Sequence, residues 1–517
     1  MTDTARSAVT ASGLRRAAAC GAIGLARIIH EVRCRITCGP LLEGEFTGRP
    51  EGSWGCETIT RTPEPMTPCL PQLRLNFHPN REIALTFDGP QTSSDGGLVL
   101  LRQLDARLGL CERVAALLPD ARDPSRVVHS RLEQVRQRLF QIALGYEDQN
   151  DADALRNDPL LRAACDRLPE DARGLSSQPT LSRLEHTVSA RDVVRLQRCL
   201  EAEYVASLPE DTSVVVLDLD STSDPTHGQQ PLAFFHGHYG CSMYFPLLVF
   251  DGEGRLVSVR LRPGNAGNNR YATPLLVRLV RAIKARLPHA QVVVRADSGF
   301  CSPRLLTALE TLAAELGDVD YVIGLEKNAR LIALLADPLE QAAARASQAG
   351  GSARVFTTLS YRAKSWPQAR FVVAKAEQLR DKSNPRFVVT TLDHIPPRML
   401  YENGYCGRGD AENRIKDFKH PLAGDRLSCT TYRANAFRLL LHAFAYRLLD
   451  ALRTHVADIA PALGRAQFDT LRLRLLKVAA HVRQSVRRIT VALPRSFGLA
   501  QVFAQVVARL DATTGTA

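Results

Sequence analysis

The sequence predicts an α/β fold built on a mixed β-sheet with flanking helices. Between residues 213 and 325 the expected order is a strand ending in acids, a hairpin, a helix, a second strand ending in an acid, a helix and a strand. Helical periodicity dominates the segments on both sides of this region. With 517 residues, 45% of them hydrophobic, the chain can bury large cores and is expected to hold two to four domains.

The first 65 residues show little hydrophobic periodicity, and residues 44–65 are rich in Gly, Pro, Thr and Glu. This composition is typical of a linker or a disordered segment. Met66 is one of only four methionines, and the periodic pattern begins just after it. Residues 1–65 are therefore interpreted as a disordered or mis-annotated N-terminal extension.

Residues 66–205 are expected to form a mainly helical domain. A short pair of strands at 73–87 comes first, and residues 98–110, 126–146 and 193–208 then place apolar side chains at helical spacing. The stretch from Ser176 to Arg183 resembles the start of a further helix. The pattern alone leaves scaffolding and DNA binding open as roles for this domain.

Three aspartates stand at the ends of two predicted strands. The β-branched run at 213–222 carries Asp218 and Asp220, which point to the same face because a strand has a period of two. The strand at 291–296 delivers Asp297 directly after it. Strand ends are where α/β proteins collect ligands. The alternative is that Asp297 only caps a helix and Asp220 only stabilises a turn.

The remaining elements follow from period-two and helical patterns. Strands are expected at 244–250 and 255–261 (a hairpin), 321–325, 353–361, 369–375 and 386–391, and helices at 271–287, 303–316, 330–348, 437–452 and 468–486.

The stretch from Tyr405 to Lys419 places opposite charges on one helical face. If it is an α-helix, Tyr405, Arg408, Glu412 and Lys419 fall within an arc of roughly 60°, with Lys416 close to the same stripe. A carboxylate that holds a metal beside bases that bind phosphate needs such a face. The alternative is a solvated helix with Arg408–Glu412 and Glu412–Lys416 ion pairs.

The net charge of +12 favours a polyanionic partner. Residues 431–517 carry thirteen Lys and Arg against four Asp and Glu, a charge of +9. This excess predicts a surface that binds nucleic acid. The alternatives are binding to an anionic membrane surface and a role in solubility alone. The twelve cysteines form no C-x-x-C pair, and no apolar run is long enough to span a bilayer. We expect reduced thiols in a cytoplasmic protein without a membrane partner.

Taken together, these motifs resemble the DDE transposases of bacterial insertion sequences, in the class with a Tyr-x2-Arg-x3-Glu-x6-Lys signature. That signature is met by Tyr405, Arg408, Glu412 and Lys419. The resemblance is closest to the insertion-sequence-thirteen-eighty group. It rests on the segments 145–151, 218–222 with His227-Gly228, 262–265 and 296–299, and it covers about residues 73–509.

This resemblance implies an RNase H-like mixed-sheet catalytic core with a β-rich insertion, between a helical N-terminal domain and a helical C-terminal region. The implied layout is 66–205 as the N-terminal domain, expected to bind DNA, 206–326 and 396–430 as the two parts of the core, 327–395 as the insertion and 431–517 as the basic helical C-terminal region.

The resemblance also implies the chemistry. Asp220, Asp297 and Glu412 would hold two Mg²⁺ ions, which Mn²⁺ is expected to replace, and Asp218 competes for the first position. Arg408, Lys419 and Lys416 would bind DNA phosphates, and Tyr405 would position them. The implied partners are the terminal inverted repeats and target DNA, bound by a dimer in a synaptic complex at the bacterial nucleoid. The alternatives are a cleavage-inactive DNA-binding relative and an RNase H-like nuclease without transposition.

Overall fold

The computed structural model describes residues 73–512, and the chain divides into two compact units at Phe87. In the first unit, β1 (Leu73–Leu75) pairs antiparallel with β2 (Ile83–Leu85), as predicted. The interpretation of residues 1–65 lies outside the described residues. The second unit, from Asp88 onward, carries all the other elements described below.

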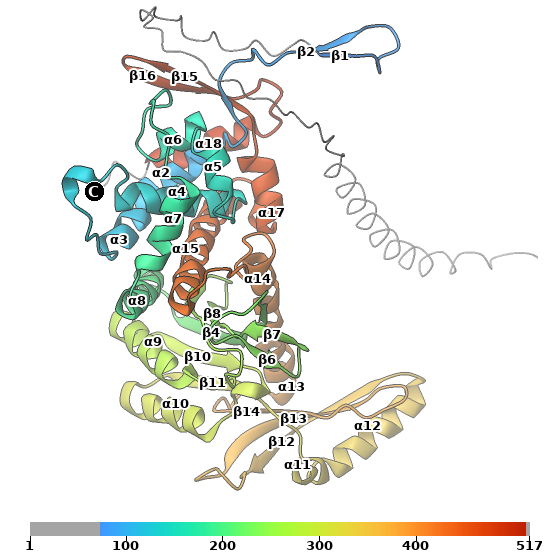
Figure 1. Ribbon diagram of the computed structural model, residues 1–517. Helices are drawn as coiled ribbons and strands as arrows, with labels where there is room; N and C mark the ends of the chain where they lie inside the picture. The colour runs from blue at the N-terminus through green and yellow to red at the C-terminus, as the bar shows by residue number, and fades with distance from the viewer. Residues whose placement is uncertain (1–72, 513–517) are drawn as a thin grey trace, which may run out of the picture. The chain divides into compact units, whose positions relative to one another are not determined.

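The second unit is a mixed α/β structure built on an eight-stranded sheet (Figure 1). The strand order is β12-β13-β14-β11-β10-β4-β8-β9. At its centre, β4 (Val214–Ser221) runs parallel to β10 (Gln291–Ala296), which runs parallel to β11 (Val319–Leu325). On the other side of β4, β8 (Leu247–Asp251) and β9 (Leu256–Arg260) form the predicted antiparallel hairpin.

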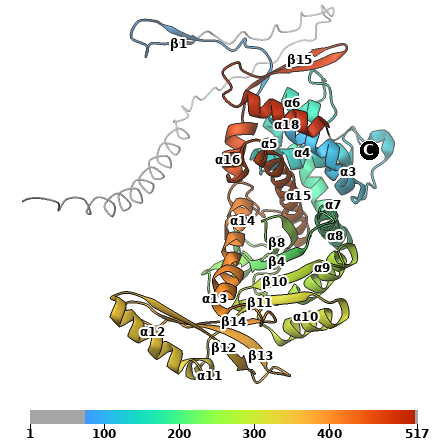
Figure 2. The same cartoon turned by 180° about the vertical axis from the view of Figure 1, so that it is seen from behind.

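Alternation along β4 separates the two faces of the sheet. Val215, Leu217 and Leu219 pack in one core with α9 (Ala272–Arg286) and α10 (Pro303–Leu316). These two helices lie side by side in both views (Figures 1 and 2). The opposite face is covered near β10 and β11 by the helical segment that begins at residue 397. Asp218 and Asp220 point to this second face, because each contacts an arginine that also touches or belongs to that segment.

The strands predicted at 353–391 extend the same sheet. β12 (Ala353–Tyr361) pairs with β13 (Arg370–Gln378), β13 with β14 (Arg386–Thr390), and β14 runs antiparallel to β11. The helical part of this region is α11 (Ala329–Ala333) followed by α12 (Ala336–Ala349). This region is therefore continuous with the central sheet.

The helices before β4 and those near the C-terminus share one core. The N-terminal set is α2 (Leu98–Leu108), α3 (Leu110–Ala116), α4 (Arg131–Leu144), α5 (Asp151–Leu155), α6 (Pro159–Ala164), α7 (Gln178–Thr187) and α8 (Ala190–Ala206). They pack around α15 (Tyr432–Ala457), which α16 (Pro461–Gly464), α17 (Phe468–Leu471) and α18 (Ala500–Ala512) follow. A buried ion-pair chain, Arg138–Glu185–Arg438, joins α4, α7 and α15.

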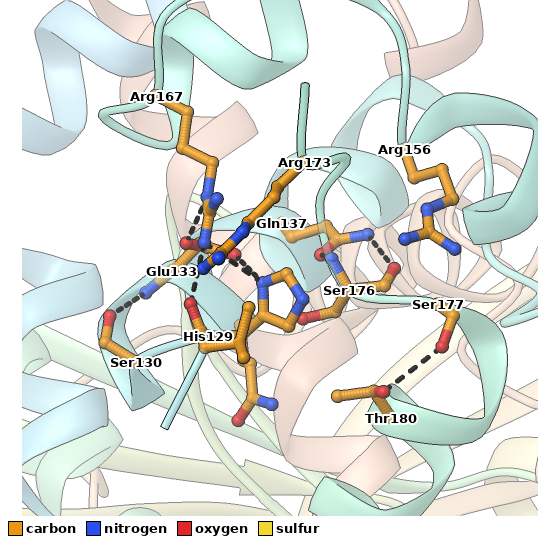
Figure 3. Close-up of polar contacts among 12 residues, drawn as sticks. His129, Ser130, Glu133, Gln137, Arg156, Arg167, Arg173, Ser176, Ser177 and Thr180 are labelled. Atoms are coloured by element: carbon orange, nitrogen blue, oxygen red, sulfur yellow. Dashed lines mark hydrogen bonds and ion pairs between the residues drawn. The ribbon is translucent and has the colours of Figure 1, made fainter. Parts of the chain in front are cut away.

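Polar contacts anchor the segment before α7 to α4 (Figure 3). The Gln137 amide donates to the Ser176 carbonyl at 2.9 Å and accepts from the Ser176 backbone N–H at 3.0 Å. Close by, Arg167 donates to Glu133 at 2.7 Å. The helix start predicted at Ser176–Arg183 is confirmed, because α7 begins at Gln178.

The helix predicted at 468–486 is wrong in its second half. After α17 and a π-helical turn at 472–476, β15 (Ala480–Ser485) pairs with β16 (Arg488–Ala492) and with β3 (Thr92–Ser93). Ala480 and Val482 are buried while Arg483 is exposed, which is the period of a strand. The local apolar content was compatible with either structure, and pairing with β3, near the other end of the chain, decides it. No helix within residues 73–512 is long and apolar enough to cross a membrane.

Candidate active site

Two predicted site residues lie at neighbouring strand ends. The register pairs Leu219 of β4 with Ala296 of β10, so Asp220 and Asp297 each follow one residue later on adjacent parallel strands. The Asp297 carboxylate accepts a hydrogen bond from the Gly299 N–H at 2.8 Å, at the start of a 3₁₀ turn. Asp297 therefore caps this turn through its Oδ1 atom, which is the capping role considered as an alternative from the sequence.

The segment that carries the signature is helical throughout but is not one α-helix. α13 (Pro397–Met399) continues into a π-helical turn at Leu400–Tyr405, a 3₁₀ turn at Cys406–Arg408 and then α14 (Gly409–Lys419). Arg295 of β10 donates to the Gly404 carbonyl at 2.9 Å. A side chain that captures a helical carbonyl disrupts the regular ladder of hydrogen bonds, and π turns are frequent at functional sites.

Arg408 joins the strand-end carboxylates to α14. Its Nη1 donates to Asp220 Oδ2 at 3.0 Å, and its Nη2 lies 3.7 Å from Glu412 Oε1. Burial opposes the positive charge of Arg408, but the nearby carboxylates, Asp220 foremost, outweigh burial and raise the pKa of Arg408. Asp220 and Glu412 therefore contact one guanidinium group, and the charge of Asp297 also favours its protonated form.

The carboxylates differ in their surroundings. Burial raises the pKa of Asp220 to about 6; Arg408 acts against this shift, and the charge of Asp297 adds to it. The Glu412 side chain is 59% exposed. Asp220 is thus partly desolvated, whereas Glu412 is open to incoming ligands.

Asp218, the competitor for the first position, has a different partner. Its carboxylate forms a bidentate ion pair with Arg295, with both N–O distances at 2.7 Å. Since Arg295 also holds the Gly404 carbonyl, this pair ties β4 to the π-helical turn.

The other signature residues, Tyr405 and Lys419, contact strand β11 and the residues that follow β4. Tyr405 lies against β11, where a Cβ atom on Gly324 would come 2.5 Å from its hydroxyl group, so this contact requires glycine. Burial raises the pKa of the Tyr405 phenol. Lys419 donates to the Ser223 carbonyl at 2.7 Å, just beyond β4, and lies 3.4 Å from Asp425. Lys416 is exposed, and no ion pair joins it to Glu412 in the described chain.

The donor set suits a hard divalent cation. Asp220, Asp297 and Glu412 offer carboxylate oxygens, which Mg²⁺ and Mn²⁺ prefer. Two of them, Asp220 and Glu412, already contact a cation, the Arg408 guanidinium. Within residues 73–512, no three His, Cys, Asp or Glu side chains lie close enough to hold one ion in the present side-chain positions. The residues fit a metal, provided that Arg408 gives way to it.

Arg262 is a site residue whose role the sequence did not reveal. Its guanidinium is fully buried and donates to the Ser221 hydroxyl at 2.7 Å and to the Phe245 carbonyl at 2.8 Å. It also bonds carbonyls of the loop at 267–270. Arg262 therefore braces the end of β4 beside Asp220. The only sequence signal was its place in the motif at 262–265.

Comparison with known proteins adds a family match. A family model described as "Transposase DDE domain group 1" matches residues 75–514. No curated protein matches the chain. Among solved structures, the chain is similar to piggyBac transposase in a synaptic complex with hairpin DNA, with a TM-score of 0.39 and 11% identity, over 74% of this chain and 80% of that one. It is also similar to Mos1 transposase in a paired-end complex with the left transposon end, with a TM-score of 0.14 and 15% identity, over 38% of this chain and 59% of that one.

Proposed function

The chain belongs to the group 1 family of DDE transposases, and from this premise we propose that it mobilises an insertion sequence by cutting and joining DNA at the ends of the element. It binds the terminal inverted repeats, hydrolyses a phosphodiester bond at each end and joins the 3′-hydroxyl to target DNA. Its class is that of the Tyr-Arg-Glu-Lys signature, closest to the insertion-sequence-thirteen-eighty group.

An RNase H-like core is part of this proposal. The mixed sheet supports it, because an antiparallel hairpin, β8–β9, adjoins the parallel strands β4, β10 and β11. In this core, Asp220 and Asp297 stand at strand ends, and Glu412 approaches from the helix on the face above them.

The observation that carries the proposed chemistry is that Arg408 contacts both Asp220 and Glu412, while Asp297 ends the strand next to that of Asp220. These three carboxylates would hold two Mg²⁺ ions, or Mn²⁺ in their place. The bound metal would supply an activated nucleophile and neutralise the leaving oxygen of an in-line displacement. The Asp218–Arg295 pair has a positioning role and does not bind metal in this proposal. It holds the π-helical turn that contains Tyr405 and leads to Arg408.

The basic residues bind the DNA backbone. Arg408 neutralises the carboxylates in the free protein, and its guanidinium turns to a phosphate when DNA and metal are bound. Lys419 is held beside the end of β4, where it would reach the same DNA strand as Arg408. Lys416 is exposed and offers a further positive charge on α14. Tyr405 positions the backbone next to them. The functional unit is a dimer in a synaptic complex at the bacterial nucleoid.

Cleavage of the element's own ends tests this function. Gel shifts should show tighter binding to the terminal repeats than to random DNA, and Mg²⁺ should release a 3′-hydroxyl at the repeat boundary. A cleavage-inactive relative would bind the repeats without cutting. An RNase H-like nuclease would bind the repeats no better than random DNA.

A further inference from the structure

Arg408 engages the oxygen atom of Asp220 that a metal ion would need. Its Nη1 donates to Asp220 Oδ2 at 3.0 Å, while Asp220 Oδ1 accepts a hydrogen bond from the Ser221 N–H at 2.8 Å. The chain itself therefore engages both oxygens of this carboxylate. The other amino group of the guanidinium, Nη2, lies 3.7 Å from Glu412 Oε1. Two of the acids proposed to bind metal thus share one positive group of the protein.

A guanidinium group and a divalent cation compete for these oxygens. Mg²⁺ binds carboxylate oxygens at about 2.0–2.1 Å, so an ion on Asp220 Oδ2 would lie within about 5 Å of Arg408 Nη1. Positive charges at this separation repel each other most where water screens them least, and the Arg408 side chain is only 16% exposed. A metal ion at Asp220 therefore has to displace Arg408.

The contacts of Arg408 are those of a displaceable group. In the described chain its side chain makes one hydrogen bond, to Asp220, and its second partner, Glu412, is 59% exposed. Arg295 shows the opposite arrangement, because both its N–O distances to Asp218 are 2.7 Å and it also holds a backbone carbonyl. Arg295 is thus a fixed brace, whereas a single hydrogen bond holds Arg408 at the carboxylates.

DNA supplies the group that draws Arg408 away. A guanidinium binds phosphate oxygens in a bidentate, charge-assisted manner, which the single bond to Asp220 does not match. Gly409, the next residue, is exposed, and a Cβ atom built on it would meet no described atom within 4 Å beyond its chain neighbours and its own helix. A backbone phosphate that enters beside Gly409 therefore competes with Asp220 for Arg408.

We propose that Arg408 is an internal competitor of the metal, so that the carboxylates bind metal tightly only after DNA has drawn the guanidinium away. The inference rests on the proposed function, because it requires metal and DNA to bind at this site. Such coupling is reciprocal: if DNA raises the affinity for metal, metal raises the affinity for DNA by the same factor, typically about 5- to 150-fold. The arrangement restricts cleavage to protein that has already bound an end of the element.

Calorimetry with Mn²⁺ on the full-length protein without DNA tests the competition directly. Arg408→Gln removes the competing charge and should bind Mn²⁺ at least about fivefold more tightly than wild type. The measurement is made at about pH 8, above the pKa of Asp220 of about 6, so that this carboxylate is deprotonated. Arg408→Lys keeps a positive charge and should bind Mn²⁺ with an affinity closer to that of wild type. Asp220→Ala should lose the heat of binding, which assigns that heat to this site.

Lys419→Met is the matched control, because Lys419 is the other cation of the signature and contacts none of the three carboxylates in the described chain. Its ammonium donates to the Ser223 carbonyl at 2.7 Å and lies 3.4 Å from Asp425. Its removal should weaken binding to terminal-repeat DNA, because a phosphate contact is lost. The Mn²⁺ affinity of the protein without DNA should stay at the wild-type value.

Gel shifts with a pre-cut terminal-repeat duplex measure the coupling from the DNA side. Mn²⁺ should tighten DNA binding more in wild type than in Arg408→Gln, since the variant has no guanidinium to displace. Unchanged or weaker Mn²⁺ binding by Arg408→Gln without DNA, or equal tightening in the two proteins, would overturn the competition. If wild type binds no Mn²⁺, or does not bind and cut the terminal repeats, the proposed function itself fails; if it does all of these and Arg408→Gln matches its Mn²⁺ affinity, only this inference fails.

Discussion

Replacing Arg262 by methionine should both destabilise the protein and slow cleavage. The Arg262 guanidinium is fully buried, and burial lowers its pKa to about 10. It has no carboxylate partner in the described chain; its five hydrogen bonds go to the Ser221 hydroxyl and to the carbonyls of Phe245, Gly267, Asn268 and Arg270. Methionine fills similar space but donates none of these bonds.

The size of the effect follows from the orphaned acceptors. Each buried carbonyl left without a donor costs about 1–3 kcal/mol. Part of this loss is offset, since the loop at 267–270 can admit water and the variant no longer buries a charge. We therefore expect a loss of about 3–5 kcal/mol in the free energy of unfolding, comparable to breaking a buried ion pair from one side. Arg262→Lys should fall between, because an ammonium cannot reach all five acceptors.

Urea unfolding measures the stability, and single-turnover cleavage of terminal-repeat DNA measures the site. Arg281→Met is the matched control, since the half-exposed Arg281–Glu315 pair should contribute less than about 1 kcal/mol. Slow cleavage under conditions where Arg262→Met remains folded would show that Arg262 positions the end of β4. A variant within about 1 kcal/mol of wild type that cuts normally would refute the bracing role of Arg262.

Three further predictions concern other parts of the chain. Burial raises the pKa of Asp220 to about 6, so its carboxylate gains a proton as the pH falls through 6. The affinity for Mn²⁺, measured by calorimetry, should drop in the same range, because a metal ligand must be deprotonated. An affinity that stays constant from about pH 7.5 to 5 would contradict this. Charge reversal at Arg487, in the turn between β15 and β16, and at Arg488, the first residue of β16, should flatten the log–log salt dependence of DNA binding by about 0.9 for each phosphate that the protein no longer neutralises. An unchanged slope would leave these residues structural. Burial and the neighbouring arginines lower the pKa of His442 to about 3, below its value in the unfolded chain. The stability that neutral His442 contributes is therefore full above about pH 6.5 and is lost as the pH falls toward 3. His442→Leu should accordingly lose less free energy of unfolding on acidification than wild type, as measured by urea unfolding. An equal loss in both proteins would assign the acid sensitivity to other groups.

The elements predicted most accurately were those with strong local patterns. The β-branched runs at β4 and β10 and the apolar periodicity of α9 and α10 depend on neighbours in sequence, so the strands that carry Asp220 and Asp297 could be placed before their partners were known. The sequence also marked Arg408 and Glu412, although it predicted a uniform α-helix where the structure has π, 3₁₀ and α segments.

What could not be predicted depends on contacts between distant residues. The π-helical turn coincides with the bond from Arg295 to Gly404, 109 residues apart, and no local pattern reports that bond. Arg262 resembles any surface arginine until the loop at 267–270 folds over it. For the same reason, β15 was taken for a helix: its edge is completed by β3 near the other end of the chain.

The central claim is that Asp220, Asp297 and Glu412 act as one metal site on DNA, and single substitutions test it most directly. Asp220→Ala, Asp297→Ala and Glu412→Ala should each lower the rate of end cleavage with Mg²⁺ by several powers of ten, because removing a metal ligand takes away several kcal/mol of transition-state stabilisation. Binding to the terminal repeats with Ca²⁺ should remain unchanged or tighten, since a charge that repels phosphate is removed. Asp218→Ala should be impaired but active. Cleavage by the Glu412 variant near the wild-type rate, or a dead Asp218 variant beside an active Asp220 variant, would contradict the assignment.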